Sequence, residues 1–192
     1  MIDKNNLFEL RADLTKKSQW NIGFYWAGLV YWIFILVVGI IFPLEIAKYL
    51  WLFGGFSIMP LAMLFSRFMN AEAFPKDNPL ADLTGLTHAF VAMLGFPMLL
   101  VSLIFYPEAQ ILMMAILYCI DFYVFSWVFQ SRIFTIVACV RVVAACLIWF
   151  LLPEFRVNLL PAFVASTYLF LVLRIPVERK KWAHNLQVVN NA

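Results

Sequence analysis

Long runs of apolar residues recur along the chain and are separated by short polar stretches. A helix rises about 1.5 Å per residue and the hydrocarbon core of a bilayer is about 30 Å thick, so a spanning helix needs about 20 apolar residues. Windows of this length predict six transmembrane helices, at residues 20–42, 46–67, 85–106, 109–130, 132–152 and 157–174. The predicted fold class is therefore all-α, with a polytopic six-helix domain over residues 20–174.

Polar or amphipathic segments flank this domain at residues 1–19 and 175–192. In the first segment Leu7, Leu10 and Leu14 fall at helical spacing with charged residues between them. This pattern predicts a short amphipathic helix that lies on the membrane surface or against the bundle. The second segment is a basic tail with a tryptophan, which suits attraction to anionic lipid headgroups.

The connections between the predicted helices are short except for residues 69–84. Within this loop the sequence Asp77-Asn78-Pro79 is typical of a turn, and Thr84 is the predicted N-cap of the third transmembrane helix. The loop is the only internal polar segment of any size.

Composition places the protein in a bilayer. The chain has 192 residues, of which 65% are hydrophobic and 13% charged, whereas soluble domains average about 45–50% and about 25%. A domain of this length cannot hide so many apolar side chains from water, so lipid must cover the excess. The lipid bilayer is the expected partner, and nothing in the composition indicates nucleic acid.

The positions of the fourteen Lys and Arg residues predict the orientation. With six helices, one side of the membrane carries nearly all of them: Lys4, Arg11, Lys16, Lys17, Arg67, Lys76, Arg132, Arg174, Arg179, Lys180 and Lys181. The other side carries only Lys48 and Arg156, and Arg141 lies within the membrane. By the positive-inside rule both termini are predicted to be cytoplasmic.

Two charged residues lie deep inside predicted spans. Asp121 and Arg141 each lie about 14 Å from the cytoplasmic end of neighbouring antiparallel helices. An unpaired charge at this depth costs at least about 2.5–3.5 kcal/mol on insertion scales. We therefore expect Asp121 and Arg141 to form an ion pair, which is either a structural lock between two helices or part of a functional site.

Other polar groups fall in the cytoplasmic half of the spans. Ser57 lies about 15 Å from the cytoplasmic end of its helix, Thr167 about 10 Å and His88 about 5 Å. The outer halves carry no ionisable Asp, Glu, His, Lys or Arg beyond their interfacial ends. This distribution predicts a polar pocket open to the cytoplasm, around Asp121 and Arg141, rather than a water-filled pore.

Enzymatic motifs are absent, including G-x-S-x-G, H-E-x-x-H, a phosphate-binding loop and an Asp-rich diphosphate motif. The three cysteines lack C-x-x-C spacing, so we expect neither a disulfide framework nor a zinc site. The sequence gives no support for catalysis, and no cofactor or metal is expected.

Four short strings carry a resemblance: RADLTKKSQW at 11–20, MPLAMLFSR at 59–67, KDNPLADL at 76–83 and FPMLL at 96–100. With these strings the chain resembles a family of small bacterial multispanning membrane proteins of unknown function. The resemblance implies a similar helical architecture and a location in the bacterial inner membrane. It implies no activity and no functional residue.

Three functional hypotheses are considered, and one of them, a lipid-modifying enzyme, would be tested by looking for product formation with candidate lipids. The other two follow from the residues themselves. In the first, the protein is a small transporter-like or ligand-binding bundle whose pocket holds a small molecule or an ion. In the second, it is a non-catalytic scaffold or accessory subunit that binds another membrane protein or a second copy of itself, and the Asp–Arg pair is only structural. A scaffold needs no convergence of polar groups in the cytoplasmic half, whereas a transporter or receptor does.

Overall fold

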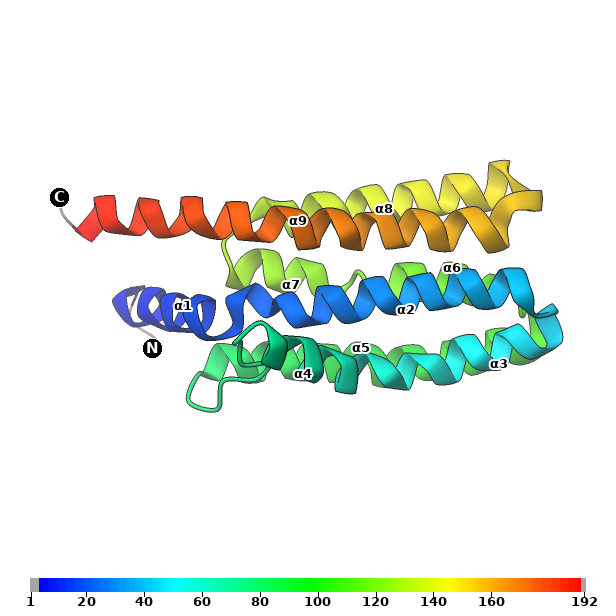
Figure 1. The fold of residues 1–192 in the computed structure, drawn as a ribbon, viewed down its shortest axis with the longest axis horizontal. Helices are drawn as coiled ribbons and strands as arrows, with labels where there is room; N and C mark the ends of the chain where they lie inside the picture. Colours follow the sequence, from blue (N-terminus) through cyan, green and yellow to red (C-terminus); the bar gives the residue numbers. More distant parts are fainter. Residues whose placement is uncertain (1–3, 191–192) are drawn as a thin grey trace.

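The computed structural model describes the backbone of residues 4–190 and the side chains of residues 6–183. All regular elements in this part of the chain are helical (Figure 1). The α-helices are α1 (Lys4–Ser18), α2 (Ile22–Ile41), α3 (Leu44–Gly54), α4 (Ile58–Phe68), α5 (Pro79–Phe105), α6 (Ala109–Leu117), α7 (Asp121–Val128), α8 (Arg132–Leu151) and α9 (Arg156–Asn190). Short 3₁₀ turns are η1 (Gln19–Asn21), η2 (Gly55–Ser57) and η3 (Pro153–Phe155).

Among the described residues, six helical stretches are long and apolar enough to cross a membrane. They are Asn6–Ile41, Leu44–Phe68, Pro79–Phe105, Ala109–Val128, Arg132–Leu151 and Pro153–Ala183. They run side by side along the long axis of the molecule, so the described ends of the chain lie at the same end of the bundle (Figure 1). The all-helical fold class and the expected six helices of spanning length are confirmed.

The third of these helices begins earlier than the sequence predicted. Its first residue is Pro79, and the side chain of Asn78 caps it by accepting a hydrogen bond from the backbone N–H of Leu80 at 3.0 Å. An Asn cap followed by proline at the first helical position is a favoured start. Thr84, the predicted cap, instead lies inside α5 and donates to the carbonyl of Ala81 at 2.8 Å.

Two spans are interrupted near their middles. In the second span η2 separates α3 from α4, and in the fourth a turn at 118–120 separates α6 from α7. The hydroxyl of Tyr31 on α2 donates to the carbonyl of Trp51 in the last turn of α3, at 2.6 Å. Hydropathy windows do not register such breaks, because the residues that form them are nearly as apolar as their neighbours.

Helix α1 docks on the end of the bundle, which is one of the two positions that its sequence allowed. The side chain of Asn78 donates to the carbonyl of Leu10 at 2.8 Å and to Asp13 Oδ2 at 2.9 Å. The guanidinium carbon of Arg11 lies 4.6 Å from the centroid of the Trp127 ring. Arg11 Nη2 also donates a hydrogen bond to the backbone carbonyl of Trp127 at 3.1 Å. Residues 1–3 of the predicted amphipathic segment, and residues 191 and 192 of the predicted tail, lie outside the described residues.

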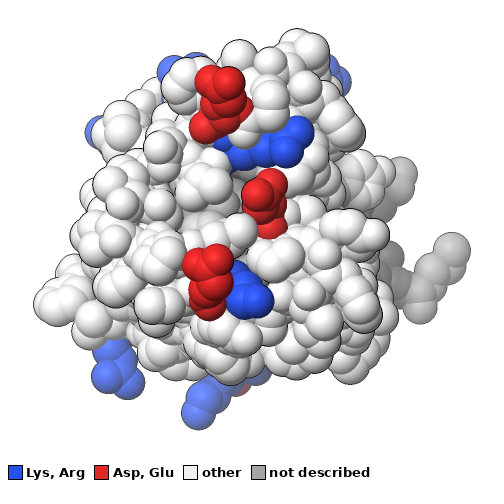
Figure 2. Space-filling model, turned by 90° about the vertical axis from the view of Figure 1, so that its right-hand side faces the viewer, with Lys and Arg blue, Asp and Glu red and all other residues white. Residues whose placement is uncertain are grey.

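The core is rich in aromatic side chains, whereas the flanks of the bundle expose large apolar ones. Trp20, Trp32 and Trp51 are almost fully buried, while Ile104 and Phe150 remain 68% and 71% exposed. Figure 2 views the end of the bundle opposite the described chain ends, and its surface is largely uncharged with a few charged side chains. Such exposed apolar flanks need a non-aqueous environment.

Candidate functional site

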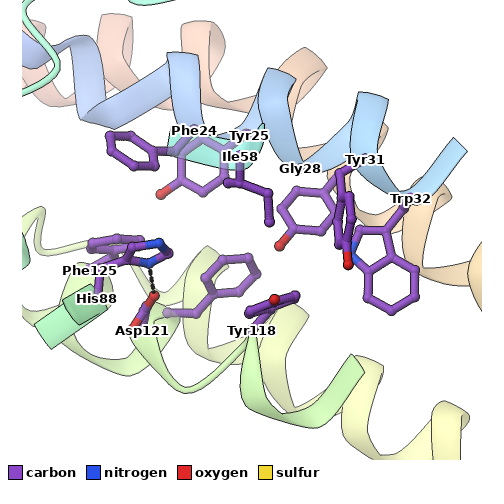
Figure 3. A pocket seen from close by; sticks show the side chains of 12 residues that line it. Phe24, Tyr25, Gly28, Tyr31, Trp32, Ile58, His88, Tyr118, Asp121 and Phe125 are labelled. Carbon is purple, nitrogen blue, oxygen red and sulfur yellow. Dashed lines mark hydrogen bonds and ion pairs between the residues drawn. The ribbon is translucent and has the colours of Figure 1, made fainter. Parts of the chain in front are cut away.

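A histidine and an aspartate from different spans form a close polar pair in the bundle interior. His88 lies on α5, and Asp121 is the first residue of α7, directly after the break in the fourth span. His88 Nδ1 and Asp121 Oδ2 are 2.6 Å apart, which is within hydrogen-bonding distance (Figure 3). Asp121 is only 3% exposed. The rings of Phe24 and His88 pack in a T-shaped arrangement, with their centroids 5.8 Å apart.

The expected ion pair between Asp121 and Arg141 is not formed in the structure, which is a correction to the interpretation of the sequence. Among the described residues Asp121 has its polar contact with His88, while Arg141 donates to Thr167 Oγ1 from Nε at 3.0 Å and from Nη2 at 2.7 Å. The guanidinium of Arg141 packs on two aromatic rings, with its carbon 4.8 Å from the centroid of the Phe122 ring and 4.3 Å from that of the Tyr168 ring. Stacking and the threonine hydroxyl therefore take the place of the carboxylate.

Of the polar residues singled out from the sequence, the structure brings four together as two pairs. His88 pairs with Asp121, and Arg141 pairs with Thr167. Phe122 links the two pairs, because it follows Asp121 in the chain and its ring contacts the Arg141 guanidinium. Ser57 does not join them. It is exposed on η2, and its hydroxyl donates to the carbonyl of Gly54 at 2.6 Å.

The His88–Asp121 pair lines a narrow cavity that we call the chamber. Aromatic residues of α2 approach it from one side, and residues of α5, α7 and the 118–120 turn approach it from the other (Figure 3). The free volume is about 30 Å³, enough for one or two water molecules or a small polar group. Its polar lining residues are Tyr25, Tyr31, Trp32, His88, Tyr118, Asp121 and Tyr168.

Three polar atoms in the chamber wall are buried without a partner. Among the described residues Tyr25 Oη, Trp32 Nε1 and Asp121 Oδ1 have no hydrogen-bond partner. Buried polar groups in proteins are nearly always hydrogen-bonded, because an unmade bond there costs about 1–3 kcal/mol. Asp121 Oδ1 can accept a hydrogen bond, Trp32 Nε1 can donate one, and the Tyr25 hydroxyl can do either.

A second, larger hollow opens on the flank of the bundle, and we call it the lateral groove. It lies between α3, η2 and α4 on one side and α5 on the other, with a volume of about 500 Å³. Ala92 and Phe96 line it, and it shares Ile58, His88 and Tyr118 with the chamber. The chamber and the groove are therefore adjacent, with His88 at their junction.

The small residues that follow His88 along α5 behave differently from one another. At Gly95 the helix approaches its neighbour closely, because an added Cβ would lie 2.8 Å from Leu117 Cδ1. Ala92 is exposed and lines the groove instead of a helix contact. Of these two small residues, only Gly95 lies at a close approach between helices.

A family model matches residues 7–178 of the chain. The chain belongs to a family of unknown function (DUF7010). The matched range includes both polar pairs, His88 with Asp121 and Arg141 with Thr167. No curated protein and no solved structure matches the chain.

The aromatic residues that line the chamber are not among those singled out from the sequence. Tyr25, Gly28 and Trp32 follow one another at helical spacing in the first span, so they share one face of α2. The helical spacing of these three residues is the feature of the sequence from which this wall of the chamber could have been predicted. Among the described residues, no group of three or more His, Cys, Asp or Glu could hold a metal ion.

Proposed function

We propose that this chain is an integral membrane protein of the bacterial inner membrane with both termini in the cytoplasm. The exposed apolar flanks support insertion, because water would not tolerate so large an apolar surface. The distribution of Lys and Arg supports the orientation, because nearly all of them lie toward the end where the described chain ends meet.

Reporter fusions test this orientation. With the C-terminus in the cytoplasm, a C-terminal green fluorescent protein fluoresces, whereas a C-terminal alkaline phosphatase stays inactive. The opposite pattern, or recovery of the chain in the soluble fraction, overturns the assignment.

Within that bundle, the chamber is a binding site for a small ligand, and the protein is a small transporter-like or ligand-binding membrane protein. The observation that carries this proposal is that Tyr25 Oη, Trp32 Nε1 and Asp121 Oδ1, all without partners among the described residues, belong to residues that line one cavity. Packing alone gives no reason to keep three unmade hydrogen bonds in one place. A ligand with hydrogen-bond donors and acceptors satisfies them.

The His88–Asp121 pair gives the site its chemical character. The imidazole engages Asp121 Oδ2 and leaves Oδ1 for a ligand. Intramembrane ionisable groups that face a cavity commonly mark substrate or proton pathways. The Arg141–Thr167 pair supports the chamber from behind, because the guanidinium packs on Phe122, which lines it.

Ligand-induced stabilisation tests the chamber directly. Purified protein in detergent micelles is heated with a panel of small cations, anions and neutral hydrogen-bonding compounds, and unfolding is followed by intrinsic fluorescence. A ligand present at 100 times its Kd stabilises the folded state by about 2.7 kcal/mol. We expect at least one class of compound to raise the Tm of the wild type and of Ser57→Ala, but not of Asp121→Asn or Tyr25→Phe.

Ser57→Ala is the matched control, because it removes a polar side chain at a similar depth but outside the chamber. If no compound raises the Tm, or every effective compound stabilises the chamber variants as much as the wild type, the binding function fails. The scaffold hypothesis, in which the intramembrane charges are only structural, is then the better account.

A further inference from the structure

The chamber and the lateral groove together form an amphipathic cavity. They share Ile58, His88 and Tyr118, so the two hollows adjoin at these residues. The His88 side chain is 24% exposed, whereas that of Asp121 is 5% exposed. The polar pair thus has an accessible side toward the groove and a buried side toward the chamber.

The groove has the size and lining of a site for an apolar chain. Its volume of about 500 Å³ falls within the range of about 300–1,000 Å³ that is typical of ligand pockets. It opens on the flank of the bundle between α4 and α5, where Ala92, Met93 and Phe96 are exposed. In a membrane this flank faces lipid, so an amphiphile can enter from the bilayer without crossing water.

The chamber selects a cationic headgroup. Among the described residues, Asp121 and His88 are the only Asp, Glu, His, Lys or Arg side chains that line the chamber or the groove. Asp121 is 97% buried and keeps Oδ1 unpaired, and the surrounding Tyr and Trp rings present electron-rich faces that attract cations. Arg141 donates from Nε and Nη2 to Thr167 and not to this oxygen, and its guanidinium packs on Phe122; its Nη1 has no partner among the described residues.

The free volume of the chamber limits the size of the headgroup. A space of about 30 Å³ accepts a primary ammonium group but not a bulky substituted one. A primary ammonium group has three N–H donors, and both Asp121 Oδ1 and the Tyr25 hydroxyl oxygen lack partners among the described residues.

We infer that the chamber and the lateral groove form one site for a long-chain primary amine, with its ammonium on Asp121 and its alkyl chain in the groove. This inference rests on the proposed function and names the ligand class of that site. Binding is reversible and needs no chemical step.

Direct binding of radiolabelled dodecylamine tests the inference. The full chain is reconstituted in phosphatidylcholine nanodiscs, and the signal from empty nanodiscs is subtracted. We expect Asp121→Asn, which removes the charge, to weaken binding about tenfold or more. We expect Ala92→Trp, which fills the groove, to weaken it by a similar factor, and dodecanol and dodecanoate to compete poorly.

Val140→Trp is the matched control for the groove substitution. Val140 is 51% exposed and lines a second flank hollow of about 290 Å³, between α8 and α9, to which neither His88 nor Asp121 contributes. We expect this variant to bind dodecylamine as the wild type does. Thermal unfolding of each variant without ligand shows that the loss of binding is not loss of the fold.

Two results overturn the inference. If dodecylamine binds the wild type and Asp121→Asn equally, or does not bind above empty nanodiscs, the amine assignment is wrong. If dodecanol or dodecanoate binds more tightly than dodecylamine and still depends on Asp121, the amine assignment is wrong but the chamber remains a ligand site. The failure of the inference is thereby distinguished from failure of the proposed function.

Discussion

Tyr25 and Tyr31 project from the same helix into the same chamber, yet only one of their hydroxyl groups is paired. Both side chains are 1% exposed. The Tyr31 hydroxyl donates to the carbonyl of Trp51 at 2.6 Å, whereas the Tyr25 hydroxyl has no partner among the described residues. The difference separates a hydroxyl group that stabilises the bundle from one that is unpaired and that, in the proposed function, a ligand would satisfy.

Removing each hydroxyl should therefore have unequal effects on stability. We expect Tyr31→Phe to lower the free energy of unfolding by about 0.5–1.5 kcal/mol, because the hydrogen bond to Trp51 is lost. Tyr25→Phe should change it by less than about 0.5 kcal/mol or raise it, because no bond is broken and a buried polar atom is removed. Unfolding with sodium dodecyl sulfate in mixed micelles measures both. A larger loss for Tyr25→Phe would contradict the chamber geometry.

A second prediction concerns the partner of Asp121. A double-mutant cycle with Asp121→Asn and His88→Gln should give a coupling energy of about 1.5–3 kcal/mol, as for hydrogen bonds to charged groups. The cycle of Asp121→Asn with Arg141→Gln should give a smaller value, because the two groups are not in direct contact. The measurement is the free energy of unfolding of each single and double variant. A stronger coupling to Arg141 would restore the pairing expected from the sequence.

The number of spanning helices follows from the sequence because bilayer thickness fixes helix length, and apolar windows report that length directly. Which intramembrane groups meet is harder to predict, because equal depth does not fix the direction in which a side chain points. Asp121 and Arg141 were matched by depth on helices assumed to be continuous. The turn at 118–120 breaks that assumption just before Asp121.

The depth of His88 was misjudged for a related reason. Counted from residue 85, His88 is about 5 Å into its helix, but counted from Pro79 it is about 14 Å in. The corrected value equals the depth estimated for Asp121, so the pair is compatible with the same depth argument. The error came from assigning the helix start to Thr84 when Asn78 and Pro79 supplied a stronger N-terminal signal.

A third prediction concerns the support of Arg141. Thr167→Val removes the hydroxyl that accepts from Nε and Nη2, so two buried donors lose their partner and the free energy of unfolding should fall by about 1–3 kcal/mol. Thr167→Ser keeps the hydroxyl and should cost less than about 1 kcal/mol. Detergent unfolding of both variants checks this. Equal losses would mean that the methyl group, not the hydrogen bond, is what matters at this position.

The fourth prediction concerns Asn78, which joins α1 to the start of α5. Its Oδ1 caps α5, while its Nδ2 donates to the carbonyl of Leu10 and to Asp13. Asn78→Ala removes all three bonds and should cost about 2–4 kcal/mol, a cap of about 1 kcal/mol and two hydrogen bonds of about 0.5–1.5 kcal/mol each.

Asn78→Asp separates the two roles of this side chain. An aspartate still caps α5, but it cannot donate, and its charge faces Asp13 and the Leu10 carbonyl. We expect α1 to detach more often in this variant, so trypsin should cut faster after the exposed Lys16. The detergent unfolding midpoint of Asn78→Asp should stay closer to that of the wild type than the midpoint of Asn78→Ala does. If cleavage at Lys16 is unchanged, the contacts of Asn78 do not hold α1 on the bundle, and its only role is as the cap of α5.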